Sequence, residues 1–196
     1  MFLSSISTLN LDGITLLSFK HSLLPHQPSL LQNWNQFDPT PCSWSGVTCS
    51  PFSGPVTGLS LPNSHLPGSI PIELARLKRL RVLNLSDNSL NGTLPISIFT
   101  TFQSLHVLNL SNNYLFDGIP TGFDYVNILA LSSNSFSGAL PLLLSGESLN
   151  YLNLSRNKLS ISVSGINVLD LSSNSFSVAG GSGRRQVMQL PMVVVV

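Results

Sequence analysis

One six-residue phrase recurs through this 196-residue chain and constrains its fold more than any other feature. The phrase is Leu-x-Leu-Ser-x-Asn, and complete copies stand at 83–88, 108–113, 129–134, 152–157 and 169–174. A weaker copy ends at Ser64, and from there successive copies are spaced by 24, 25, 21, 23 and 17 residues. A period of 20–29 residues indicates stacked repeats, each of which buries its apolar side only against its neighbours. The step of 17 predicts that the last repeat is incomplete.

The paired leucines of the phrase predict a short strand in every repeat. Side chains alternate across a strand, so Leu83 and Leu85 are expected to point into the core. Val82, Asn84 and Ser86 are then expected to point outward, on the concave face of the stack. Strands of successive repeats would pair in parallel.

The asparagine that closes each phrase is expected to be structural. A chain that turns a corner after a strand leaves backbone groups that no sheet satisfies, and a buried amide side chain can both donate to and accept from them. Replacing such an asparagine by leucine should therefore cost about 1–3 kcal/mol. The predicted ladder consists of Asn88, Asn113, Asn134, Asn157 and Asn174.

A second phrase, x-Gly-x-Leu/Ile-Pro, follows the asparagine in four repeats. The glycines are Gly68, Gly92, Gly118 and Gly138, and they are expected to allow a tight bend. The proline that follows each of them should end any regular element.

The segment before the repeats predicts a cap on the end of the stack. Residues 11–24 suggest an amphipathic helix with apolar Ile14, Leu17 and Leu24, beside Leu16 and Phe19, and with Asp12 as its N-cap. Pro25 and Pro28 would end this helix, and a second helical piece is expected at Ser29–Trp34. Cys42 and Cys49 permit one disulfide in an oxidising compartment, which we favour over two free thiols. Trp34 and Trp44 fit a lid better than a sugar-stacking site.

Composition excludes several function classes. A net charge of +1 disfavours nucleic acid and anionic membranes as partners, and charged residues make up only 9 % of the chain. No run reaches the roughly 20 apolar residues of a membrane span. There is no phosphate-binding loop, no kinase catalytic motif and no His/Cys metal spacing, so we expect no enzyme activity, no cofactor and no metal.

The ends of the chain do not fit the repeat pattern. Residues 1–9 lack the basic and apolar regions of a signal peptide and are interpreted as at most a remnant of one. Residues 179–196 combine a Gly/Ser linker with an apolar Val-rich end and are interpreted as a disordered or frame-altered tail. The chain as written would be secreted or mis-targeted.

The chain resembles the ectodomain of plant leucine-rich-repeat receptor-like kinases, in particular the group with about six repeats. The resemblance rests on Asp12 to Lys20, on Asp38 to Cys49 (Asp-Pro-Thr-Pro-Cys-Ser-Trp-Ser-Gly-Val-Thr-Cys), and on both repeat phrases. It implies an α/β repeat fold: a right-handed solenoid of the plant-specific type, with parallel strands on the concave face and a helical, disulfide-linked N-terminal cap. The cap would span residues 10–50 and the repeats residues 54–178, with the last two repeats irregular.

Two sets of surface residues are candidate sites. Four Asn-x-Ser/Thr sequons would accept glycans in a secreted chain, at Asn84, Asn91, Asn109 and Asn153. The concave-face candidates for binding are Val82, Val107, Ile128, Tyr151, Arg156 and Asp170, since exposed apolar and aromatic side chains suit a peptide or protein partner.

The leading functional hypothesis is recognition of a peptide or protein at the cell surface, without a kinase domain in this chain. The resemblance implies a location on the extracellular side of the cell membrane and pairing with a co-receptor that has its own leucine-rich-repeat ectodomain. Two alternatives stay open. One is a stand-alone secreted repeat protein, such as an inhibitor of pectin-degrading enzymes, and the other is a non-functional truncated product.

Overall fold

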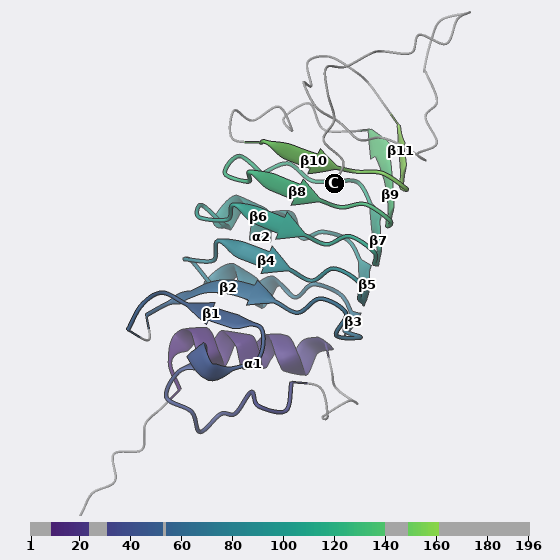
Figure 1. The fold of residues 1–196 in the computed structure, drawn as a ribbon. Helices are drawn as coiled ribbons and strands as arrows, with labels where there is room; N and C mark the ends of the chain where they lie inside the picture. The colour runs from purple at the N-terminus through teal and green to yellow at the C-terminus, as the bar shows by residue number, and fades with distance from the viewer. Residues whose placement is uncertain (1–8, 24–30, 53, 140–148, 161–196) are drawn as a thin grey trace, which may run out of the picture.

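The computed structural model describes residues 9–23, 31–52, 54–139 and 149–160, and its coils stack one above another on an N-terminal helix (Figure 1). One strand of each coil joins a six-stranded sheet of order β1-β2-β4-β6-β8-β10. All neighbours pair in parallel except β1, which is antiparallel to β2. The strands are β1 (Val47–Cys49), β2 (Val56–Ser60), β4 (Val82–Asn84), β6 (Val107–Asn109), β8 (Ile128–Ala130) and β10 (Tyr151–Asn153). This arrangement confirms the predicted solenoid.

A second sheet runs along one flank of the stack (Figure 1). Its order is β11-β9-β7-β5-β3, and its described pairs are parallel. The strands are β3 (Pro67–Gly68), β5 (Ser89–Gly92), β7 (Tyr114–Asp117), β9 (Ser135–Ala139) and β11 (Lys158–Ser160). Strands β3, β5, β7 and β9 overlap the second phrase of their repeats, whereas β11 lies in a repeat that lacks it.

The paired leucines fill the core between the sheets, as the alternation predicted. Leu83 and Leu85 are completely buried, as are their equivalents in the next two coils. Ser86, however, is buried and does not lie on the concave face. The strand β4 ends at Asn84, so the outward-inward alternation no longer applies two residues later.

The convex side of each coil adjusts to the length of its repeat. The two longest coils carry a 3-10 helix (Ile72–Arg76) and the helix α2 (Ile96–Thr101). The 21-residue coil after Asn113 has only a turn, in which the amide of Val126 donates to Phe123 O at 3.0 Å. Its strands keep register, since Val107 still pairs with Ile128. The shorter spacing therefore removes a helical turn and leaves the sheet intact.

The bend in the coil after Asn113 lies at Asp117 rather than at Gly118. Gly68, Gly92 and Gly138 adopt φ of 82°, 88° and 79°. Each lies four residues after the last residue of the Leu-x-Leu-Ser-x-Asn phrase, which is Ser64 in the first repeat. Asp117 occupies this slot with φ 73°, and Gly118 next to it has no positive φ. The interpretation of Gly118 as the bend residue was wrong, because its phrase has one extra residue before the glycine.

Replacing Asp117 by glycine is expected to stabilise the protein by about 0.5–1 kcal/mol, since L-residues pay for a left-handed backbone that glycine adopts freely. The melting temperature should rise by about 2 °C, measured by circular dichroism. Gly118→Ala serves as the matched control: space around its Cβ is open, so it should change little. A drop in melting temperature for Asp117→Gly, or a large drop for Gly118→Ala, would contradict this assignment.

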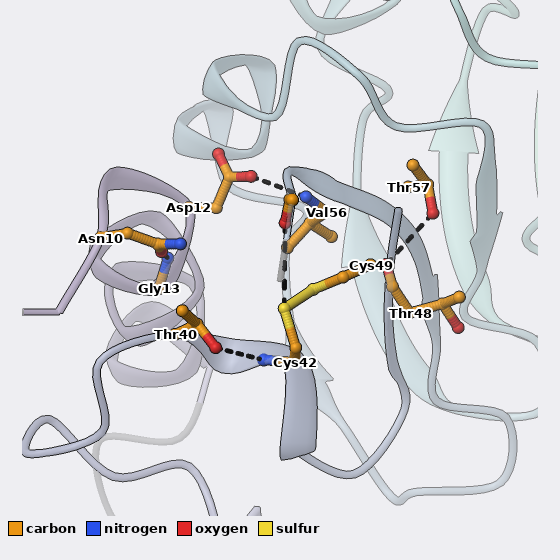
Figure 2. The surroundings of a disulfide bond; sticks show 10 residues. Asn10, Asp12, Gly13, Thr40, Cys42, Thr48, Cys49, Val56 and Thr57 are labelled. Atoms are coloured by element: carbon orange, nitrogen blue, oxygen red, sulfur yellow. Dashed lines mark hydrogen bonds between the residues drawn. A yellow bond between two sulfur atoms is a disulfide. The ribbon is translucent and has the colours of Figure 1, made fainter. Parts of the chain in front are cut away.

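The N-terminal helix α1 (Leu11–Leu23) closes the first coil, but its polar contacts differ from the prediction. Asn10, not Asp12, caps the helix, because its Oδ1 accepts from the amide of Gly13 at 2.9 Å. The Asp12 carboxylate instead accepts from the amide of Val56 at 2.7 Å (Figure 2). Asp12 thereby ties the helix to the first strand of the parallel sheet.

The buried face of α1 also differs in detail from the predicted one. Leu16, Phe19 and Leu23 are buried at helical spacing, whereas Ile14 is 48 % exposed. Residues 31–33 form a turn, so the described part of the second expected helix is not helical.

The cap has an aromatic centre and a disulfide. Trp34 stacks on Trp44 with centroids 5.3 Å apart, and Phe19 lies 6.2 Å from Trp34. Each indole N–H is satisfied: Trp34 donates to Ser45 O at 3.0 Å and Trp44 to Asp38 Oδ2 at 2.7 Å. Cys42 and Cys49 are disulfide-bonded, which links the 3-10 helix Pro41–Ser43 to β1 (Figure 2).

Several predicted features lie outside the described residues. They are the remnant segment before Leu9, the residues 24–30 with Pro25 and Pro28, the segment 140–148, the last repeat and the tail from 161 onward, which include Asp170 and Asn174.

Candidate functional site

A row of apolar side chains crosses the concave face of the six-stranded sheet. Val82 pairs in register with Val107, Val107 with Ile128, and Ile128 with Tyr151. Residues in register on parallel strands lie side by side, about 4.8 Å apart. Val82 and Ile128 are 37 % and 39 % exposed, and the other two are half-buried. The predicted binding candidates on the strands therefore form one continuous row, which we call the concave row.

A second row lies beside it, two residues further along each strand. It consists of Asn84, Asn109, Ala130 and Asn153, which are also in register. Each asparagine is half-buried, and its Oδ1 accepts from the amide of the serine two residues on, at 3.0–3.2 Å. In Asn153 the Nδ2 group donates to the Tyr151 hydroxyl at 3.3 Å. Three of the four sequons therefore lie on the concave face.

Asn88, Asn113, Asn134 and Asn157 form a connected hydrogen-bond ladder along the stack. Asn88 and Asn113 both donate to Leu85 O, at 3.0 Å each, and Asn113 and Asn134 share Leu110 O in the same way. Each carbonyl thus accepts from the asparagine of its own coil and from that of the next. The Oδ1 atoms accept from amides of the flank strands. For example, Asn113 Oδ1 accepts from the amide of Leu90 at 3.0 Å. These side chains hold neighbouring coils together and are not available to a ligand.

Arg156 lies at the edge of the sheet rather than on a strand. It is exposed, and its φ is 55° in the turn after β10. The equivalent residues of the preceding coils also have positive φ, and two of them contact each other: Asn112 Nδ2 donates to Asp87 Oδ1 at 2.7 Å. Arg156 is separate from the concave row.

Sequence reasoning missed an aromatic pair on the flank. Tyr114 and Phe116 on β7 are 66 % and 48 % exposed, on either side of the buried Leu115. The alternation of Tyr-Leu-Phe around a core leucine was a signal that could have identified them. Next to them on β5 lies Asn91, the one sequon asparagine that is exposed rather than half-buried.

The described residues contain no group of three or more His, Cys, Asp or Glu side chains that could hold a metal ion. Two open depressions, of about 570 and 520 Å³, each include Gln32 and Asn33; the first lies on the cap, and the second extends onto the first coil at residues 61–65. Within the same described part of the chain, no helix is long and apolar enough to cross a membrane.

A solenoid of leucine-rich repeats, closed by a helical cap with a disulfide, is the class of protein that these features define. Sequence models of two known families match the chain and agree with this class. The leucine-rich-repeat N-terminal domain matches residues 9–50, and the leucine-rich repeat itself matches residues 79–100 and 104–126. A receptor protein kinase-like protein of Arabidopsis thaliana is 38 % identical over 215 aligned positions, which cover 82 % of this chain and 28 % of that protein.

Solved structures give the same result. The ectodomain of BIR2 from Arabidopsis thaliana matches with a TM-score of 0.75 and 30 % identity, over 85 % of this chain and 94 % of that one. The Arabidopsis receptor kinase HAESA, in complex with the peptide hormone IDA and the co-receptor SERK1, matches with a TM-score of 0.75 and 32 % identity, over 86 % of this chain and 30 % of that one. The chain belongs to the family of plant leucine-rich-repeat receptor-like kinases and corresponds to their ectodomain. It spans less than a third of the length of the receptor protein kinase-like relative.

Proposed function

We propose that this chain is the extracellular recognition module of a plant receptor-like kinase, and that it binds an extended peptide along the concave row. The observation that carries the proposal is the register of Val82, Val107, Ile128 and Tyr151, which joins four partly exposed apolar side chains into one surface. Isolated apolar side chains on a surface are ordinary, but a contiguous row marks an interaction site.

The size and chemistry of this surface favour a peptide. Three inter-strand steps give a row about 14 Å long, which matches about four residues of an extended chain. The asparagines beside the row carry Nδ2 groups on a half-buried face, where they can donate to peptide carbonyls. The solved complex of HAESA with a peptide hormone and a co-receptor supports this class of partner. A co-receptor with its own leucine-rich-repeat ectodomain is the second partner that we propose. The module itself would recognise a ligand and catalyse nothing.

The proposal is tested with the secreted chain and a displayed library of random 12-residue peptides. We expect selected peptides to lose at least about tenfold in affinity on the variant Ile128→Asp, because a charge in the row would have to be desolvated by an apolar ligand. Ile96→Asp is the matched control: Ile96 is 54 % exposed, but it lies on α2, away from the sheet face. Absence of enrichment on the wild-type chain, or equal losses in both variants, would overturn the proposal.

A further inference from the structure

The exposed aromatic pair on the flank, Tyr114 and Phe116, plays no part in the function proposed above. Both side chains point outward from β7, since the intervening Leu115 is completely buried. The rest of the described flank surface is polar around them, with Ser89 and Asn91 on β5, and Ser135 and Ser137 on β9. Two large aromatic rings on a polar sheet face indicate that something covers them.

The neighbouring strand carries a group that can supply this cover. Asn91 on β5 pairs in register with Tyr114 on β7. These two strands lie side by side on the flank in Figure 1. Asn91 begins the sequon Asn91-Gly92-Thr93, in which both Asn91 and Thr93 are exposed. Within the described part of the chain, no hydrogen bond holds the Asn91 side chain.

The asparagines of the other three sequons differ from Asn91 in exposure and in hydrogen bonding. The side chains of Asn84, Asn109 and Asn153 are half-buried and accept hydrogen bonds from the serine two residues on. A glycan there would also lie across the proposed peptide surface. Asn91 leaves that surface free, because it projects from the flank sheet.

We propose that Asn91 is an N-glycosylation site and that the first N-acetylglucosamine of its glycan packs over Tyr114 and Phe116. In the attachment step, Asn91 Nδ2 attacks C1 of the sugar of a lipid-pyrophosphate-linked oligosaccharide. The N–C1 bond forms, the C1–O bond to the pyrophosphate breaks, and Nδ2 gives up one proton. A sugar ring has an apolar C–H face that suits aromatic rings, and the 4.8 Å spacing of adjacent strands places that ring within reach of both side chains. The proposal rests on the secretory location that the proposed function assigns to the chain.

The test uses the full chain, secreted from plant cells behind a supplied signal peptide. Mass spectrometry after glycosidase treatment in heavy-oxygen water is expected to find Asn91 modified in most molecules. Thr93→Ala removes the sequon without changing Asn91, and we expect it to lower the melting temperature by about 2 °C. In the background of Tyr114→Ser combined with Phe116→Ser, the same removal should change the melting temperature by less than about 0.5 °C, because both packing partners are already lost.

Three results would overturn the proposal: an unmodified Asn91, an equal effect of Thr93→Ala in both backgrounds, or a dimer in sedimentation of the wild-type chain that Phe116→Ser abolishes. The last result would assign the aromatic pair to self-association. Because the signal peptide is supplied, a failure here leaves peptide recognition intact. If the peptide library shows no enrichment while Asn91 is found glycosylated, only the proposed peptide recognition is overturned.

Discussion

Trp34→Ala is expected to destabilise the protein by about 4 kcal/mol, the cost typical of deleting a buried tryptophan side chain. Trp34 is 3 % exposed, stacks on Trp44 and lies against Phe19 of helix α1. Its removal would open a cavity between Phe19 of the helix and Trp44 and would leave Ser45 O without its indole donor. Urea unfolding followed by circular dichroism, with the disulfide intact, measures the change in the free energy of unfolding.

Two controls identify the cause of this loss. Trp34→Phe keeps an aromatic ring and loses the N–H donor and part of the volume, so it should cost about 1–2 kcal/mol. Phe37→Ala removes an aromatic side chain that is 77 % exposed, and its effect should stay within about 0.5 kcal/mol. A small effect of Trp34→Ala would contradict the role of the indoles as a lid and would revive a binding role for them.

Asn113→Leu is expected to lower the free energy of unfolding by about 3 kcal/mol, because the apolar side chain cannot replace the ladder contacts. The amide of Leu90 would lose its acceptor, and the carbonyls of Leu85 and Leu110 would each lose one of two asparagine donors. Asn91→Leu is the matched control, since the same change at an exposed flank position breaks no such contact. The comparison uses unglycosylated protein, so that only the side chains differ.

A double-mutant cycle tests the ladder itself. Asn88 and Asn113 share Leu85 O, so the two leucine substitutions should couple by about 1 kcal/mol, beyond the sum of their separate effects. Asn88 and Asn157 share no carbonyl among these contacts, and their substitutions should add within about 0.5 kcal/mol. Additive behaviour of the first pair would show that the asparagines act independently rather than as a ladder.

The concave row was predictable because it depends on two regular features. Alternation along a strand sends Val82 and Ile128 outward, and the repeat period brings their strands into register. The prediction failed at Ser86, where the strand has already ended. It also failed at Asp12: an aspartate near a helix start suggests a cap, but its partner, Val56, lies 44 residues along the chain.

The sequence by itself determined that the chain forms a solenoid, that leucines fill its core and that asparagines line its turns, because each of these follows from a local pattern repeated in every coil. Only the tertiary structure decided which outward residues of the flank become neighbours. Asn91 and Tyr114 come from different coils, and the pairing of β5 with β7 brings them together. The stacking of coils turns separate residues into surfaces, and the flank surface follows from pairing that no single repeat contains.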